Sequence, residues 1–185
     1  MKLNDTYEYI VLCEDAQTKT FIRSFLLQHN IPSGKIHFRN YPVGKGCGEQ
    51  FVREAYFIEA RLLSSRYKFR REVLVVCSDA DSYSVIQKAK SLDEKIAQFD
   101  KSWDRTKLPV LMWIPKREIE TWIHYLRGED VDEQTSYRHS GNPERCKKEA
   151  IRFKEYCQDV IEFSEVPSSM NFAKEEYIRV CNMQH

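Results

Sequence analysis

Residues 71–79, REVLVVCSD, hold five consecutive apolar side chains and then end at a carboxylate. A strand that is apolar at every position is buried on both faces, as in parallel sheets that helices cover on both sides. Other segments with strand character lie at 7–13, 35–41 and 108–115. Segments with the 3.6-residue period of amphipathic helices lie between them, at 17–30, 49–67, 84–100 and 117–128.

This alternation of strands and helices predicts an α/β fold. We expect a four-stranded, mainly parallel sheet with helices on both faces. In the helix at 49–67, Phe51, Ala55, Ile58 and Leu62 form the stripe expected to face the core. From residue 129 the chain becomes polar and rich in turns, and one helix is expected at 144–160, with another candidate in the tail. The predicted organisation is a domain over 1–128 and a small helical C-terminal extension over 129–185.

The composition favours a cytoplasmic protein. Charged residues make up 31% of the chain, and no apolar run approaches the roughly 20 residues that span a bilayer, so we expect no membrane partner. The N-terminus lacks the pattern of a signal peptide. Six cysteines without a CxxC pair suit reduced thiols and argue against a zinc site. A net charge of +1 means that any nucleic-acid surface must be local.

Acidic residues follow three of the predicted strands. Glu14 follows the first, Asp79 and Asp81 follow the third, and the segment 116–120, KREIE, follows the fourth. Because ligands of open parallel sheets bind at the carboxyl ends of the strands, these groups are expected along one edge. Carboxylate oxygens are the ligands that Mg²⁺ and Mn²⁺ prefer, and phosphodiester chemistry is a common use of such a site.

Each of these residues also has a purely structural interpretation. A single aspartate after a strand is often a helix N-cap, so Asp81 or Ser82 is a candidate cap for the helix that begins near Tyr83. Arg117 and Glu120 lie three residues apart and are candidates for a surface ion pair on a helix. The sequence alone does not separate these interpretations from a metal site.

The order of a strand ending in Glu, a helical unit and then a strand ending in DxD resembles the TOPRIM domain. Residues 11–15, VLCED, are similar to its glutamate motif, and 75–82, VVCSDADS, to its DxD motif; the resemblance covers about 7–127. Asp15 stands where the family usually has glycine. The second acid of OLD-type members is missing from 16–18, AQT, which leaves Asp15 as a substitute and the number of metal ions open.

The resemblance implies roles for individual residues. Glu14, Asp79 and Asp81 would hold Mg²⁺ or Mn²⁺, with Glu14 alternatively acting as a general base. Lys116 would contact the scissile phosphate, and Glu118 or Glu120 would be a further ligand. Lys45, in the glycine-rich segment GKGCG, and Arg117 would contact nucleic acid.

Within the family, the segments PVGKGCG and IPKREIETW make the chain most similar to stand-alone or OLD-type TOPRIM nucleases of bacterial defence systems. The implied function is a divalent-metal-dependent nuclease that acts on DNA, with RNA as an alternative, and that serves as an anti-phage effector. Because the chain has no P-loop, an ATPase would be a separate subunit. The alternative is a non-catalytic TOPRIM-like binding or regulatory module of a larger complex.

Overall fold

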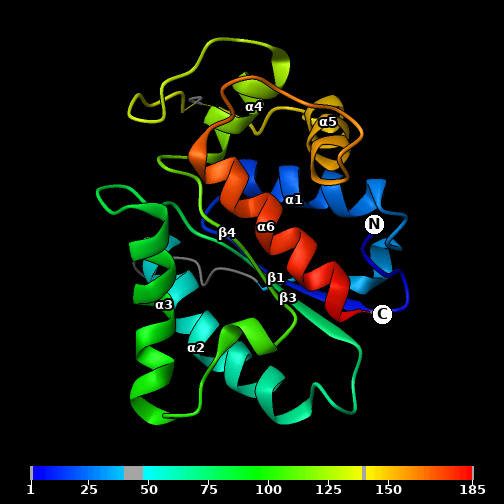
Figure 1. Ribbon diagram of the computed structural model, residues 1–185, viewed down its shortest axis with the longest axis vertical. Coiled ribbons are helices and arrows are strands. Elements are labelled where there is room, and N and C mark those ends of the chain that lie inside the picture. Colours follow the sequence, from blue (N-terminus) through cyan, green and yellow to red (C-terminus); the bar gives the residue numbers. More distant parts are fainter. Residues whose placement is uncertain (1, 40–47, 139–140, 185) are drawn as a thin grey trace.

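The computed structural model describes residues 2–39, 48–138 and 141–184, and it confirms the predicted α/β fold (Figure 1). Four parallel strands form one sheet in the order β2-β1-β3-β4. Their bounds are Glu8–Leu12 for β1, Ile36–Phe38 for β2, Glu72–Cys77 for β3 and Val110–Trp113 for β4. The fold is Rossmann-like, with the strands shorter than the apolar segments that predicted them.

Helices flank the sheet on both sides. Their bounds are Ala16–Gln28 for α1, Gly48–Arg66 for α2, Val85–Phe99 for α3, Ile119–Arg127 for α4, Lys147–Cys157 for α5 and Ser168–Met183 for α6. Two short 3₁₀ turns, at Ser33–Lys35 and Arg105–Lys107, precede β2 and β4. Every helix predicted from the sequence is present, including the candidate in the tail.

The strand order reverses direction between β1 and β3. From β1 the chain moves outward to β2, and then returns to the other side of β1 to add β3 and β4. The register pairs Val11 with Val75 and Leu12 with Val76, so the residues that follow the two strands emerge side by side. In open α/β sheets a reversal of this kind opens the crevice in which ligands bind.

Successive residues of β3 point into two different cores. Val73 and Val75 belong to a cluster that includes residues of α1, α4, α5 and α6. Leu74 and Val76 belong to a second cluster, formed with α2 and α3. Both clusters remove the strand from water, which is the physical reason for the unbroken apolar run at 73–77.

The C-terminal helices complete the first of these cores. Phe153 of α5 packs against Phe25 and Trp113, with ring centroids 5.4 and 5.3 Å apart. Tyr177 of α6 packs against Phe25 at 6.0 Å. The predicted boundary at 128 therefore separates two segments of chain whose side chains share one core.

Helix α6 also covers the edge of the sheet beside β4 (Figure 1). The Arg179 guanidinium donates hydrogen bonds to the carbonyl oxygens of Leu108, at 2.9 Å, and of Val110. An exposed edge strand would present these groups to another chain. The contact satisfies the edge and anchors the C-terminal helix.

The core-facing stripe of α2 differs from the predicted one. The structure buries Val52, Tyr56 and Leu63, whereas Ile58 and Leu62 are exposed. Both sets have helical spacing, and the structure selects the one that includes a tyrosine. The Tyr56 hydroxyl donates to Asp93 at 2.6 Å, which gives this buried side chain its polar partner.

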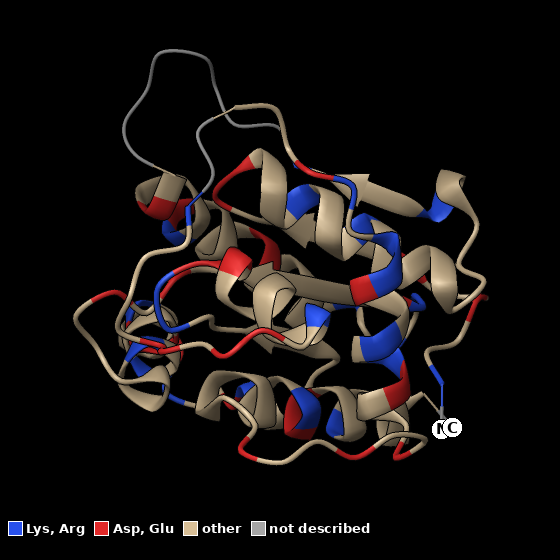
Figure 2. Ribbon diagram, turned by 90° about the horizontal axis from the view of Figure 1, so that it is seen from above, with Lys and Arg blue, Asp and Glu red and all other residues tan. Residues whose placement is uncertain are grey.

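Acidic and basic residues are interspersed over the helices in the view of Figure 2. Across the described ranges, no helix has both the length and the apolar character needed to cross a bilayer.

His29 gives the fold a dependence on pH. Its ring is buried against Phe25 and Tyr177, and neither ring nitrogen has a partner in the described part of the chain. Burial, reinforced by the nearby Lys154 charge, lowers the His29 pKa from 6.5 to about 3. Between these pH values His29 is protonated in the unfolded chain and neutral in the folded protein. The free energy of unfolding is therefore highest above pH 6.5 and falls as the pH drops towards 3.

We predict that this histidine lowers the free energy of unfolding by about 2 kcal/mol between pH 7 and pH 5, at 1.36 kcal/mol for each pKa unit. In His29→Leu this contribution should vanish, and urea titrations at both pH values measure it. His37→Leu, which alters a half-exposed imidazole paired with Glu8, should keep the loss. An unchanged loss in His29→Leu would contradict the account.

Candidate functional site

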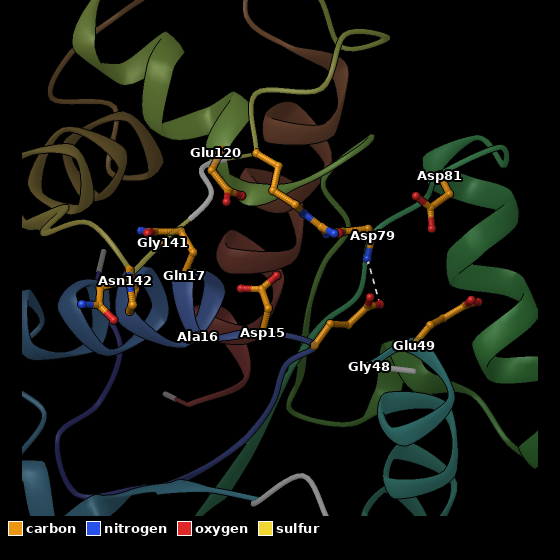
Figure 3. A pocket seen from close by; sticks show the side chains of 13 residues that line it. Asp15, Ala16, Gln17, Gly48, Glu49, Asp79, Asp81, Glu120, Gly141 and Asn142 are labelled. Carbon is orange, nitrogen blue, oxygen red and sulfur yellow. Dashed lines mark hydrogen bonds between the residues drawn. The ribbon is translucent and has the colours of Figure 1, made fainter. Parts of the chain in front are cut away.

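A pocket of about 530 Å³ opens at the carboxyl edge of the sheet, beside the reversal between β1 and β3 (Figure 3). Six of its lining residues are acidic and come from the ends of β1 and β3 and from α2 and α4. The lining residues are Glu14, Asp15, Ala16, Gln17, Gly48, Glu49, Asp79, Asp81, Glu120, Arg138, Gly141, Asn142 and Pro143. The expected convergence of acids from distant parts of the sequence is therefore present.

The Glu14 carboxylate is held by the residues that follow β3. Its Oε1 accepts a hydrogen bond from Ser78 Oγ at 2.5 Å and another from the Asp79 amide at 3.1 Å, drawn as a dashed line in Figure 3. Burial raises the Glu14 pKa, while these hydrogen bonds and the Lys88 charge act against the rise. The side chain is thereby fixed across the junction of the two strands.

Asp79 is the most buried acid of the pocket, with 4% of its surface exposed. Burial raises its pKa well above the usual value, and the charges of Glu14, Asp15 and Asp81 raise it further. Removing a carboxylate from water and placing it near others of the same sign costs free energy. A bound cation would relieve that cost.

Asp81 is exposed and has the left-handed backbone conformation, with φ of 51°. It does not cap the following helix: the cap is Ser84, which forms a capping box with Gln87. The proposed capping roles of Asp81 and Ser82 are therefore wrong. The Asp81 side chain lies at the rim of the pocket and is not used to cap α3.

Lys116 supports the backbone at this rim. Its Nζ donates to the carbonyl oxygens of Asp81, at 2.9 Å, and Tyr83, at 2.5 Å. The residue lines a neighbouring groove and is not among those that line the acidic pocket. The structure thus places the predicted phosphate-contacting lysine behind the turn that carries Asp81.

Asp15 has a structural duty as well as a place in the pocket. It is the N-cap of α1, and its Oδ1 accepts a hydrogen bond from the Thr18 amide at 2.8 Å. In Figure 3 its carboxylate points from the start of α1 into the pocket. One side chain therefore begins the helix and adds negative charge to the site.

Glu118 and Glu120, which the sequence does not distinguish, have different surroundings. Glu118 is buried and accepts hydrogen bonds from Ser136 Oγ, at 2.8 Å, and from the Tyr137 amide. Glu120 lines the acidic pocket and is 7% exposed, and its Oε2 is buried without a hydrogen-bond partner in the described part of the chain. Burial raises the pKa of Glu120. Of the two, Glu120 is therefore the residue whose carboxylate is available to a ligand in the pocket.

Of the two residues predicted to contact nucleic acid, only Arg117 lies in the described part of the chain, and it does not line the acidic pocket. Arg117 is exposed, its Nε donates to the Gln134 carbonyl at 3.1 Å, and it lines a smaller pocket beside Asp81 and Glu118. Lys45 lies outside the described residues.

Glu49 is a lining residue that the sequence analysis missed. Gly48 places it there: a Cβ at Gly48 would lie 2.6 Å from the Glu14 carbonyl oxygen, so only glycine allows α2 to begin against the end of β1. Glu49 Oε1 accepts from Lys88 Nζ at 2.7 Å, and Lys88 is 1% exposed. This hydrogen bond lowers the pKa of Glu49. The negative charge of Glu49 is therefore balanced by Lys88, whereas the Glu120 Oε2 has no partner in the described part of the chain.

The segment after α4 forms another wall of the pocket that the sequence analysis did not predict. Arg138 and residues 141–143 line the pocket, and the segment is tied to α1 through Gln17. The Gln17 amide group donates to the Glu144 carbonyl at 3.2 Å and accepts from the Glu144 amide at 2.6 Å. The only sequence signal was the polar, turn-rich composition of this region, which does not specify where it docks.

The six acidic side chains of the pocket supply carboxylate oxygens, which are the ligands that a hard divalent cation prefers. These carboxylates do not, however, surround a single position at the distances of metal ligands. Within 2–39, 48–138 and 141–184, no three His, Cys, Asp or Glu side chains converge closely enough to chelate one ion. The pocket therefore offers carboxylates around a space and not a preformed cage.

Searches of protein-family models, curated proteins and solved structures found no match to this chain.

The contact between Gly48 and Glu14 predicts a pair of matched substitutions. Gly48→Ala places a Cβ 2.6 Å from the Glu14 carbonyl oxygen and 2.9 Å from its Cβ, so we expect a loss of about 1–3 kcal/mol in the free energy of unfolding. Gly34→Ala meets nothing within 4 Å and should change it by less than about 1 kcal/mol. Chemical denaturation measures both. Equal stabilities of the two variants would contradict the close approach of α2 to β1.

Proposed function

We propose that the acidic pocket binds a divalent cation, Mg²⁺ or Mn²⁺, and that the protein is a metal-dependent nuclease. Glu14, Asp79, Asp81 and Glu120 would supply the cation's protein ligands. The substrate class is nucleic acid, DNA first and RNA as the alternative.

The observation that carries this proposal is the unpartnered Oε2 of Glu120. A buried carboxylate oxygen without a hydrogen bond is costly, and native structures rarely retain one without a role. The Glu120 carboxylate points into a pocket that also holds Asp15 and Asp79 (Figure 3). A cation in that space would satisfy Glu120 and offset the repulsion that raises the pKa of Asp79.

The open arrangement favours Mg²⁺ or Mn²⁺ over a cation that needs a tight protein cage. Mg²⁺ usually keeps several water molecules and is bound through one or two carboxylates together with substrate phosphates. A pocket of about 530 Å³ has room for a hydrated ion and a phosphate group. The lack of three converging side chains in the described ranges is compatible with that mode of binding.

When bound, the cation would activate water and neutralise charge that develops on a phosphate. The protein's own contribution is to hold the acids in place. Ser78 and the Asp79 amide orient Glu14, and Lys116 fixes the backbone beside Asp81. Because Glu14 is already ordered by two donors, it needs little reorganisation to bind a cation or to accept a proton from water.

The resemblance to TOPRIM nucleases supports this function, since Glu14 and the DxD aspartates lie together at the sheet edge. On the same resemblance we propose an anti-phage effector of the bacterial cytoplasm that works with a separate ATPase subunit. The second candidate is a binding module that takes up a cation without cleaving nucleic acid. Two observations favour this candidate: the Glu49 carboxylate is already paired with Lys88, and Lys116 bonds to backbone carbonyl groups outside the pocket.

Cation binding predicts opposite effects of Asp79→Asn on stability and on metal response. Without divalent cations, removing this buried charge should raise the free energy of unfolding by about 1 kcal/mol, or roughly 2–4 °C in Tm. With Mn²⁺ at a hundred times its Kd, the wild type should gain about 2.7 kcal/mol, and the variant much less. Thermal denaturation with and without Mn²⁺ measures both effects.

Glu162→Gln is the matched control, because it removes one carboxylate from an exposed position outside the pocket. It should respond to Mn²⁺ as the wild type does. An Asp79→Asn variant that keeps the full Mn²⁺ response would remove this residue from the cation site.

The nuclease proposal predicts cleavage that depends on the added cation. Purified protein should cut plasmid or single-stranded DNA, or RNA, with Mn²⁺ and not with EDTA. Glu120→Gln should lower the rate at least about 100-fold, as expected when a metal ligand is lost. Gel assays of wild type, Glu120→Gln and Glu162→Gln test this. A wild type that binds Mn²⁺ and cuts none of the three substrates would support the binding module instead.

A further inference from the structure

We propose that Arg138 binds the phosphate group of the nucleic-acid strand at the acidic pocket, and that Glu118 is a positioning residue that holds Arg138 there. This inference rests on the proposed function, and it assigns the substrate-binding side of the same site. Arg138 lies in the segment between α4 and α5, beyond the part of the chain that resembles TOPRIM domains.

Arg138 is the one lysine or arginine among the described residues that line the acidic pocket. It also lines the adjoining pocket beside Asp81 and Glu118. Its charge acts against the rise in the pKa of both Asp79 and Glu120, which places it near the two buried acids. Even so, no ion pair involving Arg138 occurs within the described ranges, so its guanidinium remains available to a ligand.

The backbone that carries Arg138 is fixed by Glu118. This buried carboxylate accepts hydrogen bonds from Ser136 Oγ and from the Tyr137 amide, immediately before Arg138. The Tyr137 ring packs on His124 of α4, with centroids 5.3 Å apart. Arg138 therefore leaves the chain from an anchored point and not from a free loop. This explains why Glu118 is buried and fully hydrogen-bonded although it is not part of the acidic pocket.

The opposed charges select a phosphate as the ligand. A site for a cation alone gains nothing from an arginine, because the two positive charges repel each other. A phosphate group can contact a cation on the acidic wall and a guanidinium on the other side at the same time. Arginine also presents paired N–H donors that match phosphate oxygens, which a lysine does not.

Binding of a fluorescent oligonucleotide, single-stranded or duplex, tests the inference by anisotropy in Ca²⁺. Arg138→Ala should raise the Kd about tenfold or more, and Arg138→Lys should restore part of the affinity. Affinity for Mn²⁺ in the absence of DNA should not fall in either variant. In cleavage assays the change should lie mainly in KM. Arg61→Ala, an exposed arginine thirteen residues along α2 from Gly48, is the control and should bind DNA as the wild type does.

The role of Glu118 is tested by a double-mutant cycle. Glu118→Ala should weaken oligonucleotide binding, and adding it to Arg138→Ala should cause no further loss, because it acts through Arg138. Glu118→Gln, which can still accept a hydrogen bond, should recover part of the affinity. Additive losses would contradict the positioning role.

The outcomes separate this inference from the proposed function. A wild type that binds the oligonucleotide through Arg138 without cutting it overturns the nuclease proposal and keeps the phosphate site. An Arg138→Ala variant that binds as tightly as the wild type overturns the phosphate site and leaves the nuclease proposal in place. A wild type that binds no oligonucleotide overturns the phosphate site.

Discussion

The carboxylate of Glu14 is held by the chain that follows β3, and the rest of the site depends on this link. Parallel pairing of β1 and β3 brings the two strand ends side by side, and Ser78 and the Asp79 amide then bind Glu14. The contact joins residues 64 and 65 positions apart in the chain. It also places two acids together at the point where the sheet changes direction, which is where an α/β fold leaves space for a ligand.

Holding these acids together opposes the stability of the protein. Burial raises the pKa of Glu14, Asp79 and Glu120, so their charged forms are less stable in the fold than in water. The structure compensates for some nearby charge, as in the pair of Lys88 and Glu49, and leaves the Oε2 of Glu120 without a partner. Sites that evolve for binding often retain strain of this kind, because the ligand relieves it.

Much of the fold could be predicted because its signals are local. The apolar run at 73–77 indicated burial on both faces, and the alternation of elements indicated a parallel sheet, which together placed Glu14, Asp79 and Asp81 at one edge. The stripe of α2 was wrong because two stripes with helical spacing compete, and only packing against the sheet and the contact with Asp93 decides between them. The N-cap of α3 was wrong because Asp81, Ser82 and Ser84 are all good caps and backbone geometry selects one.

Other parts of the site depend on contacts between distant segments, which no local pattern records. Glu49 reaches the pocket because Gly48 packs against Glu14, and Arg138 reaches it because Glu118 anchors the preceding residues. The sequence could not separate Glu118 from Glu120, since both follow the same strand. Their roles diverge only when the segment after α4 folds back over one of them.

The account as a whole requires a cation between the ends of β1, β3 and the start of α4. A crystal grown with Mn²⁺, with diffraction recorded at a wavelength where manganese scatters anomalously, would locate that ion directly. We predict an anomalous peak inside the acidic pocket, within coordination distance of a Glu120 oxygen and of Glu14 or Asp79. A fully ordered pocket without a peak, in crystals that bind Mn²⁺ elsewhere, would contradict the central claim.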